Sequence, residues 1–152
     1  RLVMLMGRHH PLSGTAPSLD DYLAWPHLQV SGGGDKDSPV EQVLAPLGLS
    51  RRWFARVPFF QAAVEVLLRT DCLMTTPAHI AWQLSREHAL SFCDLPFATR
   101  VQQYHLLWHQ RHHLDPAHRW FRELAYPFLR DHLQRTLGES RKQLGLKADP
   151  LR

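Results

Sequence analysis

The pattern of apolar and polar positions predicts strands and helices that alternate along the chain. Polar and apolar residues alternate in Pro26–Val30, as in a half-buried strand, whereas Phe59–Arg69 is apolar on almost every side, which is typical of a buried helix. The same criteria predict strands at Arg1–Met6, Pro26–Val30, Arg52–Val57, Cys72–Thr76, Ala89–Cys93 and Tyr104–His109. Helices are predicted at Leu19–Ala24, Pro39–Leu47, Phe59–Arg69, from Pro77 to about Leu84, and from Pro116 onward. Strands that alternate with helices indicate an α/β domain.

Three of the predicted helices begin at recognisable caps. Ser18 precedes a first turn with two aspartates, while Ser38 and Asp115 each precede a proline. A Ser or Asp cap accepts a hydrogen bond from a backbone N–H of the first turn, and proline suits the first helical position because it has no N–H to leave unpaired. Pro127 lies inside the last helix and is expected to kink it, because proline removes a backbone donor.

Length and composition predict one globular domain. The chain has 152 residues, 44% of them hydrophobic, and no apolar run approaches the ~20 residues that a membrane helix needs. The first six residues are too short for the core of a signal peptide. Cys72 and Cys93 lie among apolar neighbours without Cys-x-x-Cys spacing. We therefore expect two buried thiols in a reducing cytoplasm, rather than a disulfide or a pair of metal ligands.

The net charge of +4 is concentrated at the C-terminal end. Residues 130–152 contain six basic and three acidic side chains, so they carry +3 and leave +1 for the other 129 residues. A DNA-binding face requires a basic stripe on the folded body, which a nearly neutral body does not supply. We expect residues 137–152 to form a basic, solvated tail, and the sequence leaves open whether that tail is ordered.

Several short motifs occur in a characteristic order. They are Gly7–Gly14 (GRHHPLSG), Leu19–His27 (LDDYLAWPH), Arg56–Phe60 (RVPFF) with Val66–Asp71 (VLLRTD) and Met74–Pro77 (MTTP), and Leu107–His109 (LWH) with Asp115–Arg122 (DPAHRWFR). In order and spacing, from residue 3 to about 130, they resemble the effector-binding domain of LysR-type transcriptional regulators. Each motif is short and unspecific by itself, so the resemblance rests on the series.

The resemblance implies a type-2 periplasmic-binding-protein-like α/β fold, with an effector held between two lobes joined by two crossovers. Residues from about 7 to 75 would form a complete lobe II, and residues from about 77 to 136 would supply the C-terminal part of lobe I. The first half of lobe I and an N-terminal helix-turn-helix are expected to be absent from this chain. The implied function is that of a ligand sensor, which contacts DNA only through the missing N-terminal domain.

The resemblance also implies a homo-oligomer in the full-length protein. In this family, lobe II of one subunit packs against lobe I of its partner. The lobe II surface would consist of the Pro39–Leu47 helix and the Arg52–Val57 strand. The helix has apolar residues at the spacing of one continuous stripe, which a core-facing helix could also use alone: Val40, Val43, Leu44 and Leu47.

By the same resemblance, three segments would face the effector, and aromatic or carboxylate compounds are candidate ligands. The segments are Ser31 and Gly32; Phe59, Phe60 and Gln61; and Thr75 and Thr76. The first offers a hydroxyl and free backbone N–H groups, the second opens a helix and supplies rings, and the third lies at the returning crossover. The alternative is that the glycine run is a flexible turn and that both phenylalanines are core residues.

Neither a metal site nor a catalytic set is expected. Five histidines lie within fourteen residues, but His105 and His109 would be ~13 Å apart on one strand face, at ~3.3 Å per residue, which is too far for one ion. The glycines after Ser31 match neither a nucleophile elbow nor a phosphate-binding loop. We expect no cofactor and no enzymatic activity. The alternative function is a free-standing α/β solute-binding or hydrolase-like domain.

Overall fold

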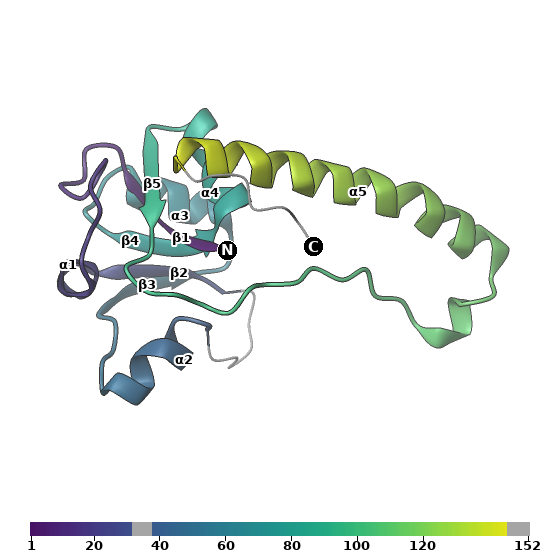
Figure 1. Ribbon diagram of the computed structural model, residues 1–152, viewed down its shortest axis with the longest axis horizontal. Coiled ribbons are helices and arrows are strands. Elements are labelled where there is room, and N and C mark those ends of the chain that lie inside the picture. The colour runs from purple at the N-terminus through teal and green to yellow at the C-terminus, as the bar shows by residue number, and fades with distance from the viewer. Residues whose placement is uncertain (32–37, 146–152) are drawn as a thin grey trace. The chain divides into compact units, whose positions relative to one another are not determined.

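The computed structural model describes residues 1–31 and 38–145, and the chain divides into two compact units. The first unit comprises residues 1–100, and the second begins at Val101. A mixed sheet with helices forms the first unit, and a segment without strands followed by one long helix forms the second (Figure 1). None of the described helices is both long and apolar enough to cross a membrane.

The sheet of the first unit has five strands in the order β3-β2-β4-β1-β5. They are β1 (Leu2–Gly7), β2 (His27–Val30), β3 (Trp53–Val57), β4 (Leu73–Pro77) and β5 (Leu90–Asp94). β2 is parallel to β3 and β4, whereas β1 is antiparallel to β4 and β5. The last residues of β2, β3, β4 and β5 therefore lie at the same end of the sheet, which we call the carboxyl end.

Helices cover both faces of this sheet. On one face lie α1 (Leu19–Ala24), α2 (Glu41–Leu44) and the 3₁₀ turn η1 (Ala45–Leu47), while α3 (Phe60–Leu67) and α4 (Ala78–Glu87) cover the other. Successive residues of a strand point to opposite faces, so the unbroken apolar run of β1 fills both layers. The core on the α1 face consists of Leu2, Met4, Met6, Tyr22, Val40, Leu44 and Leu73. Each fully buried Leu or Met stabilises the fold by roughly 1.5–3 kcal/mol.

Of the two caps predicted on the α1 face, Ser18 is confirmed, whereas Ser38 does not cap α2, whose N-cap residue is Val40. Ser18 Oγ accepts the N–H of Asp21 at 3.1 Å, and the Asp21 carboxylate accepts the N–H of Ser18 at 2.9 Å. Ser38 accepts a backbone N–H two residues later and contacts Glu41, but the regular helix begins only at Glu41 rather than at Pro39. η1 ends at Gly48, whose φ of 68° costs a glycine little.

A buried arginine joins the two helices of this face. Arg51 lies two residues before β3 and is only 7% exposed. Its guanidinium donates to the Glu41 carboxylate (Nε to Oε1, 2.8 Å; Nη2 to Oε2, 2.7 Å), to Ser38 Oγ at 3.1 Å and to the Tyr22 hydroxyl at 3.3 Å. It also lies over the Trp53 ring, 4.3 Å from the centroid. A buried charge is costly unless it is paired, so these contacts fix α1 and α2 against the start of β3.

The turn after β1 requires glycine at position 7. A Cβ added there would lie 2.7 Å from the carbonyl oxygen of Leu67, which is a clash with backbone. His10 closes the turn, because its N–H donates to the Gly7 carbonyl and its Nδ1 accepts the N–H of Leu12, both at 3.0 Å. The buried His10 ring packs edge-on against Trp25, at 4.5 Å between centroids, and thereby ties this turn to the end of α1.

The division into units differs from the lobe boundary that the resemblance implied near residue 76. β5 pairs with β1, and α4 packs against β1, β4 and β5, so both elements belong to the first unit. The compact unit therefore ends at residue 100. Thr75 and Thr76 lie inside β4 of this unit, and the chain continues from them into α4.

The long helix of the second unit begins where its cap predicts. α5 (Pro116–Gln143) follows Asp115, whose carboxylate accepts the N–H of His118 at 3.0 Å. The helix continues through Pro127 without interruption and extends seven residues into the stretch expected to be a tail. Residues 146–152, the remainder of that expected tail, lie outside the described residues.

The prediction of a strand at Tyr104–His109 is wrong. Residues 101–109 have no regular secondary structure and lead into the 3₁₀ turn η2 (Gln110–His112). A strand needs a neighbouring strand to pair its backbone groups. Within the described part of the chain, no strand of the sheet pairs with this segment. The segment has the local pattern of a strand but does not belong to the sheet that the structure describes.

Replacing Arg51 by alanine should lower the free energy of unfolding by about 2–3 kcal/mol, because Glu41 then loses its cation. The loss is smaller than for a fully buried pair, since the Glu41 side chain is 34% exposed and water can solvate it. Equilibrium urea denaturation measures the change. Arg69→Ala is the control, because its pair with Glu65 is exposed on both sides and should contribute less than about 0.5 kcal/mol. Equal losses in the two variants would contradict this role of Arg51.

Candidate ligand-binding site

The three segments predicted to face a ligand meet at the carboxyl end of the sheet. Ser31 follows β2, Phe59 and Phe60 follow β3, and Thr75 and Thr76 lie in the last three residues of β4. β2 is the middle one of three parallel strands, so the residues that follow it lie beside those at the ends of its neighbours. In open α/β sheets, ligands bind at the carboxyl ends of the strands.

Ser31 contributes a hydroxyl to this end of the sheet but no free backbone N–H. Its N–H donates to the carbonyl oxygen of Val57 at 2.9 Å, which extends the β2–β3 pairing by one residue. The expectation that this N–H is free to hold an anion is therefore wrong. The Ser31 residue is half-buried. Gly32, the other residue predicted in this loop, lies outside the described residues.

The start of α3 presents backbone donors and aromatic rings. Phe59 is the N-cap residue, and no side chain in the described part of the protein caps the helix. The first N–H groups of a helix have no partner within it, and the helix dipole favours an anion there. Phe59 is 68% exposed, Phe60 is half-buried and Gln61 is exposed. Phe59 is therefore not a core residue, and Phe60 can form an apolar wall.

Thr75 and Thr76 point to opposite faces of the sheet, because successive strand residues alternate. Thr75 is half-buried, and its Oγ1 lies 2.8 Å from the Tyr22 hydroxyl on the α1 face. Thr76 is only 2% exposed, and its hydroxyl has no hydrogen-bond partner among the described residues. Thr75 is thus the more exposed residue of the pair.

Next to Thr75, Tyr22 and His27 form a buried pair. The Tyr22 carbonyl oxygen accepts a hydrogen bond from His27 Nε2 at 2.8 Å, and the two ring centroids are 4.4 Å apart. A carbonyl can only accept, so Nε2 carries the proton of a neutral imidazole. Burial lowers the pKa of His27 from 6.5 to about 4. His27 is therefore a neutral donor at pH 7 that fixes the position of Tyr22.

Tyr22 and Arg51 were not singled out from the sequence. They are 29 residues apart, and only the folded chain brings the phenol and the guanidinium together. The one available signal was a tyrosine within the LDDYLA motif, which alone is equally typical of a core position. Tyr22 contacts Thr75 and Arg51 contacts Tyr22, so both residues lie behind the candidate site.

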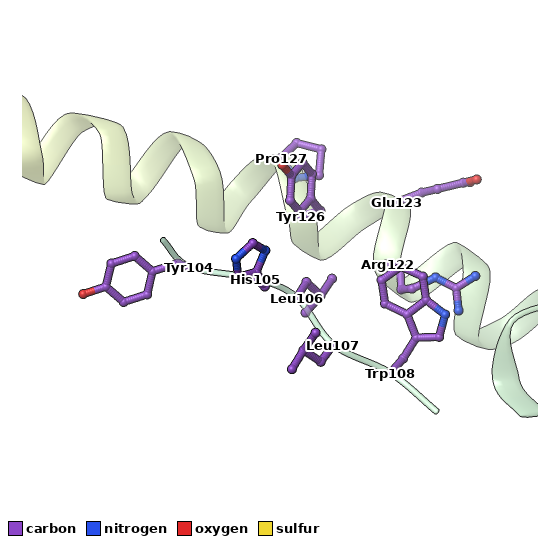
Figure 2. Close-up of a pocket in the computed structure, with 9 residues that line it drawn as sticks. All are labelled: Tyr104, His105, Leu106, Leu107, Trp108, Arg122, Glu123, Tyr126 and Pro127. Carbon is purple, nitrogen blue, oxygen red and sulfur yellow. The ribbon is translucent and has the colours of Figure 1, made fainter. Parts of the chain in front are cut away.

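The second unit has a groove of its own, about 640 Å³ in volume, between residues 104–108 and α5. Figure 2 shows this segment running alongside the helix, with Leu106, Leu107 and Trp108 on one wall and Tyr126 on the other. Arg122 lies over the Trp108 ring, 4.6 Å from its centroid, and donates to the carbonyl oxygens of residues 112 and 113. None of the predicted effector contacts lines this groove.

Two histidines of the second unit, His112 and His118, contact each other and neighbouring arginines. His112 and His118 stack with centroids 5.3 Å apart, and His118 Nδ1 lies 2.8 Å from Nη1 of Arg122. Arginine can only donate, so this nitrogen is used as an acceptor. Within residues 1–31 and 38–145, no three His, Cys, Asp or Glu side chains are grouped so that they could hold a metal ion. His105 and His109 do not lie on a strand, so the strand spacing expected between them does not occur.

The LysR substrate binding domain family model matches residues 1–130. The chain belongs to this family. The resemblance inferred from the motifs is confirmed, and the sheet with helices on both faces agrees with the periplasmic-binding-protein-like fold that it implied.

Three similar proteins are described as transcriptional regulators or as the regulatory domain of one. The HTH-type transcriptional activator NahR of Pseudomonas putida is 27% identical over 129 residues, which cover 85% of this chain and 43% of NahR. A putative transcriptional regulator from Vibrio parahaemolyticus matches with a TM-score of 0.73 and 28% identity, over 91% of this chain and 62% of that one. The regulatory domain of MexT, a transcriptional activator in Pseudomonas aeruginosa, matches with a TM-score of 0.67 and 31% identity, over 81% of this chain and 60% of that one.

This LysR substrate-binding domain thus spans less than half the length of NahR. The family comprises the effector-binding domains of transcriptional regulators and is not an enzyme family. A free-standing solute-binding or hydrolase-like domain, the alternative function, is not favoured by these matches.

Lowering the pH from 6.5 to 4 should destabilise the domain through His27. In this window the unfolded chain binds a proton at His27 that the folded chain excludes, since the folded pKa is about 4. The free energy of unfolding therefore falls with falling pH, by up to about 3 kcal/mol, and this residue contributes no further loss below pH ~4. His27→Gln can keep a donor for the Tyr22 carbonyl but cannot titrate, so urea denaturation should show a flatter pH profile.

The exposed His132, changed to glutamine, is the control and should leave the wild-type profile unchanged. Parallel profiles for His27→Gln and the wild type would contradict the assignment.

Proposed function

We propose that this LysR substrate-binding domain senses a small effector at the carboxyl end of its sheet and passes the signal to a DNA-binding domain elsewhere in the complete protein. One observation carries the proposal: Ser31, Phe60 and Thr75 lie at or just beyond the carboxyl ends of adjacent strands in a domain of a regulator family. The proposed role involves no catalysis, and the proposed location is the cytoplasm, where a bacterial regulator reaches its promoter.

The chemistry of this end of the sheet suits an aromatic or carboxylate-bearing ligand. Ligand sites are mostly apolar, with a few polar groups that fix the orientation of the ligand. Phe60 supplies an apolar surface, while the two hydroxyls and the uncapped start of α3 supply polar contacts. Gly32, Phe59, Gln61 and Thr76 remain predicted as further contacts.

We assign the first unit to lobe II and the second unit to part of lobe I. The division at residue 100 supports this assignment, with the boundary later than the sequence implied. An effector can shift the arrangement of two lobes only if it binds one arrangement better than the other. The ligand must therefore also contact lobe I, and contacts from lobe II alone would not transmit a signal.

The exposed apolar surface of α5 supports the proposal that a further part of lobe I packs against the second unit. α5 exposes large apolar side chains over several turns: Trp120 (65%), Phe121 (56%), Leu124 (59%), Phe128 (72%) and Leu129 (52%). Apolar surface of this extent marks an interaction site. Tyr104–His109 has the sequence pattern of a strand but is not part of the described sheet, so further strands of lobe I would account for both features.

The lobe II surface proposed for the homo-oligomer consists of η1 and the edge strand β3. Val40 and Leu44 from the predicted stripe are each 1% exposed and belong to the core. Leu47 on η1 and Phe54 on β3 are 60% and 55% exposed. These two side chains, rather than the whole stripe, are therefore the apolar part of the proposed subunit interface.

The complete gene product should bind an aromatic carboxylate, and Ser31→Ala and Phe60→Ala should each weaken binding. Loss of one hydrogen bond predicts about a three- to ten-fold weaker affinity, and loss of the phenyl contact predicts about ten-fold or more. Isothermal titration calorimetry with a panel of benzoate derivatives measures both effects. Ser50→Ala is the matched control, because Ser50 precedes β3 at the opposite end of the sheet and should bind as the wild type does. Unchanged affinity in both site variants would remove these residues from the site.

Two charges in the proposed interface should dissociate the oligomer of the complete gene product. Leu47→Glu combined with Phe54→Glu places a carboxylate at each exposed apolar position, which opposes burial of that surface. Light scattering should then report the monomer mass. Gln42→Glu adds a charge at an exposed polar position of α2 and should leave the oligomer intact. An unchanged mass for the double variant would place the interface elsewhere.

A further inference from the structure

The hydroxyl of Tyr22 lies between an arginine and a threonine. Arg51 Nη1 is 3.3 Å from Tyr22 Oη on one side, and Thr75 Oγ1 is 2.8 Å from it on the other. Tyr22 has no exposed surface, so water does not satisfy its hydroxyl. The Arg51 guanidinium is itself held by Glu41 and Ser38. The contact is therefore built into the core and does not depend on a mobile side chain.

The direction of these hydrogen bonds follows from the chemistry of the groups. A guanidinium has five N–H donors and no acceptor, so Tyr22 Oη must accept from Arg51. The single proton of the phenol then needs an acceptor of its own, and the described residues offer it only Thr75 Oγ1. If Thr75 donated to Tyr22 instead, a buried O–H would be left unpaired, at the full cost of its desolvation. Tyr22 therefore donates to Thr75.

The phenol keeps the proton that this direction requires. Burial raises the pKa of Tyr22 above its ordinary value of 10, which outweighs the opposing effect of the nearby Arg51. The group is thus neutral at any pH at which the regulator would work. The Arg51 guanidinium can only donate, so Arg51 donates to Tyr22 and Tyr22 donates to Thr75.

Thr75 is left with a hydroxyl proton to donate. One lone pair of its oxygen accepts the hydrogen bond from Tyr22, which limits the directions in which its O–H can point. Thr75 is half-buried on a strand whose last residue lies at the carboxyl end of the sheet, beside the strand that leads to Ser31. A ligand at this position thus meets a donor whose orientation is set from behind.

We propose that Tyr22, held by Arg51, is a positioning residue that fixes Thr75 as a hydrogen-bond donor, so that the site selects effectors presenting an acceptor oxygen over those presenting a donor. The inference rests on the proposed function, because it assumes that an effector binds beside Thr75. The inference adds that Tyr22 and Arg51 determine whether the ligand must supply the acceptor or the donor of this hydrogen bond. Positive charge is not the cause of the selection, because Glu41 pairs with Arg51.

Benzoate and benzamidine test the proposal on the complete gene product. The two molecules have nearly the same shape, but the carboxylate only accepts hydrogen bonds and the amidinium only donates them. The wild type should prefer benzoate in calorimetric titration. Thr75→Val and Tyr22→Phe should each weaken benzoate binding by about ten-fold and change benzamidine binding by less than about two-fold. Thr75→Ser keeps the hydroxyl and should retain the wild-type preference.

A double variant separates positioning from a general effect on the fold. If Tyr22 acts through Thr75, then Tyr22→Phe should cause no further loss of benzoate affinity in the Thr75→Val background. Tyr126→Phe, an exposed tyrosine of the second unit, is the matched control and should bind both probes as the wild type does. Circular dichroism verifies folding, and if Tyr22→Phe fails to fold, the comparison of Thr75→Val with Thr75→Ser decides.

The outcomes distinguish this inference from the function on which it rests. A wild type that binds neither benzoate nor benzamidine at millimolar concentration contradicts the aromatic-ligand site and the inference together. A wild type that prefers benzoate, with variants that keep that preference or lose both probes equally, overturns the inference alone. Additive losses in the double variant would show that Tyr22 does not act through Thr75.

Discussion

The charge of Arg51 is the constraint on which the arrangement of the first unit depends. An isolated buried cation would cost several kcal/mol, so the folded chain must bring partners to it. These partners come from α1 and α2, which have six and four residues and are far below the ~12–15 residues at which an isolated helix becomes even marginally stable. Pairing one charge therefore positions two helices that local propensity would not hold. Through Tyr22, the same contacts reach Thr75 on β4 and the candidate site.

Elements whose signals are local were predictable, and those that need a distant partner were not. Ser18 and Asp115 predict the starts of α1 and α5 because a cap is satisfied within one turn. Tyr104–His109 has the composition of a strand, but a strand forms only when another strand pairs with it. At the C-terminal end, a basic composition suggested a tail, yet α5 extends to Gln143, since charged residues with good helix propensity continue a helix at little cost.

The same distinction applies to the site. The family resemblance pointed to Ser31, Phe60 and Thr75, and the sheet explains why they lie at one end, because parallel strands end on one side of a sheet. The hydrogen-bond partners of each group could not be predicted in this way. The Ser31 N–H is used by Val57, and the Thr75 oxygen is used by Tyr22, two contacts between segments far apart in the chain. Which groups remain free for a ligand is therefore a property of the fold.

The two units differ in how much of their apolar surface they bury within themselves, and this difference bears on signalling. The first unit buries apolar side chains on both faces of its sheet, whereas the second leaves most of the large side chains of α5 in solvent. A single rigid unit can bind a ligand, but binding changes the arrangement of the two units only if the second unit also contacts that ligand. If the rest of lobe I covers α5, then the rigidity of the second body, and hence the signal, depends on residues beyond this chain. The hydroxyls and rings of the first unit would then set which ligand is bound, while the transmitted change would be set by lobe I.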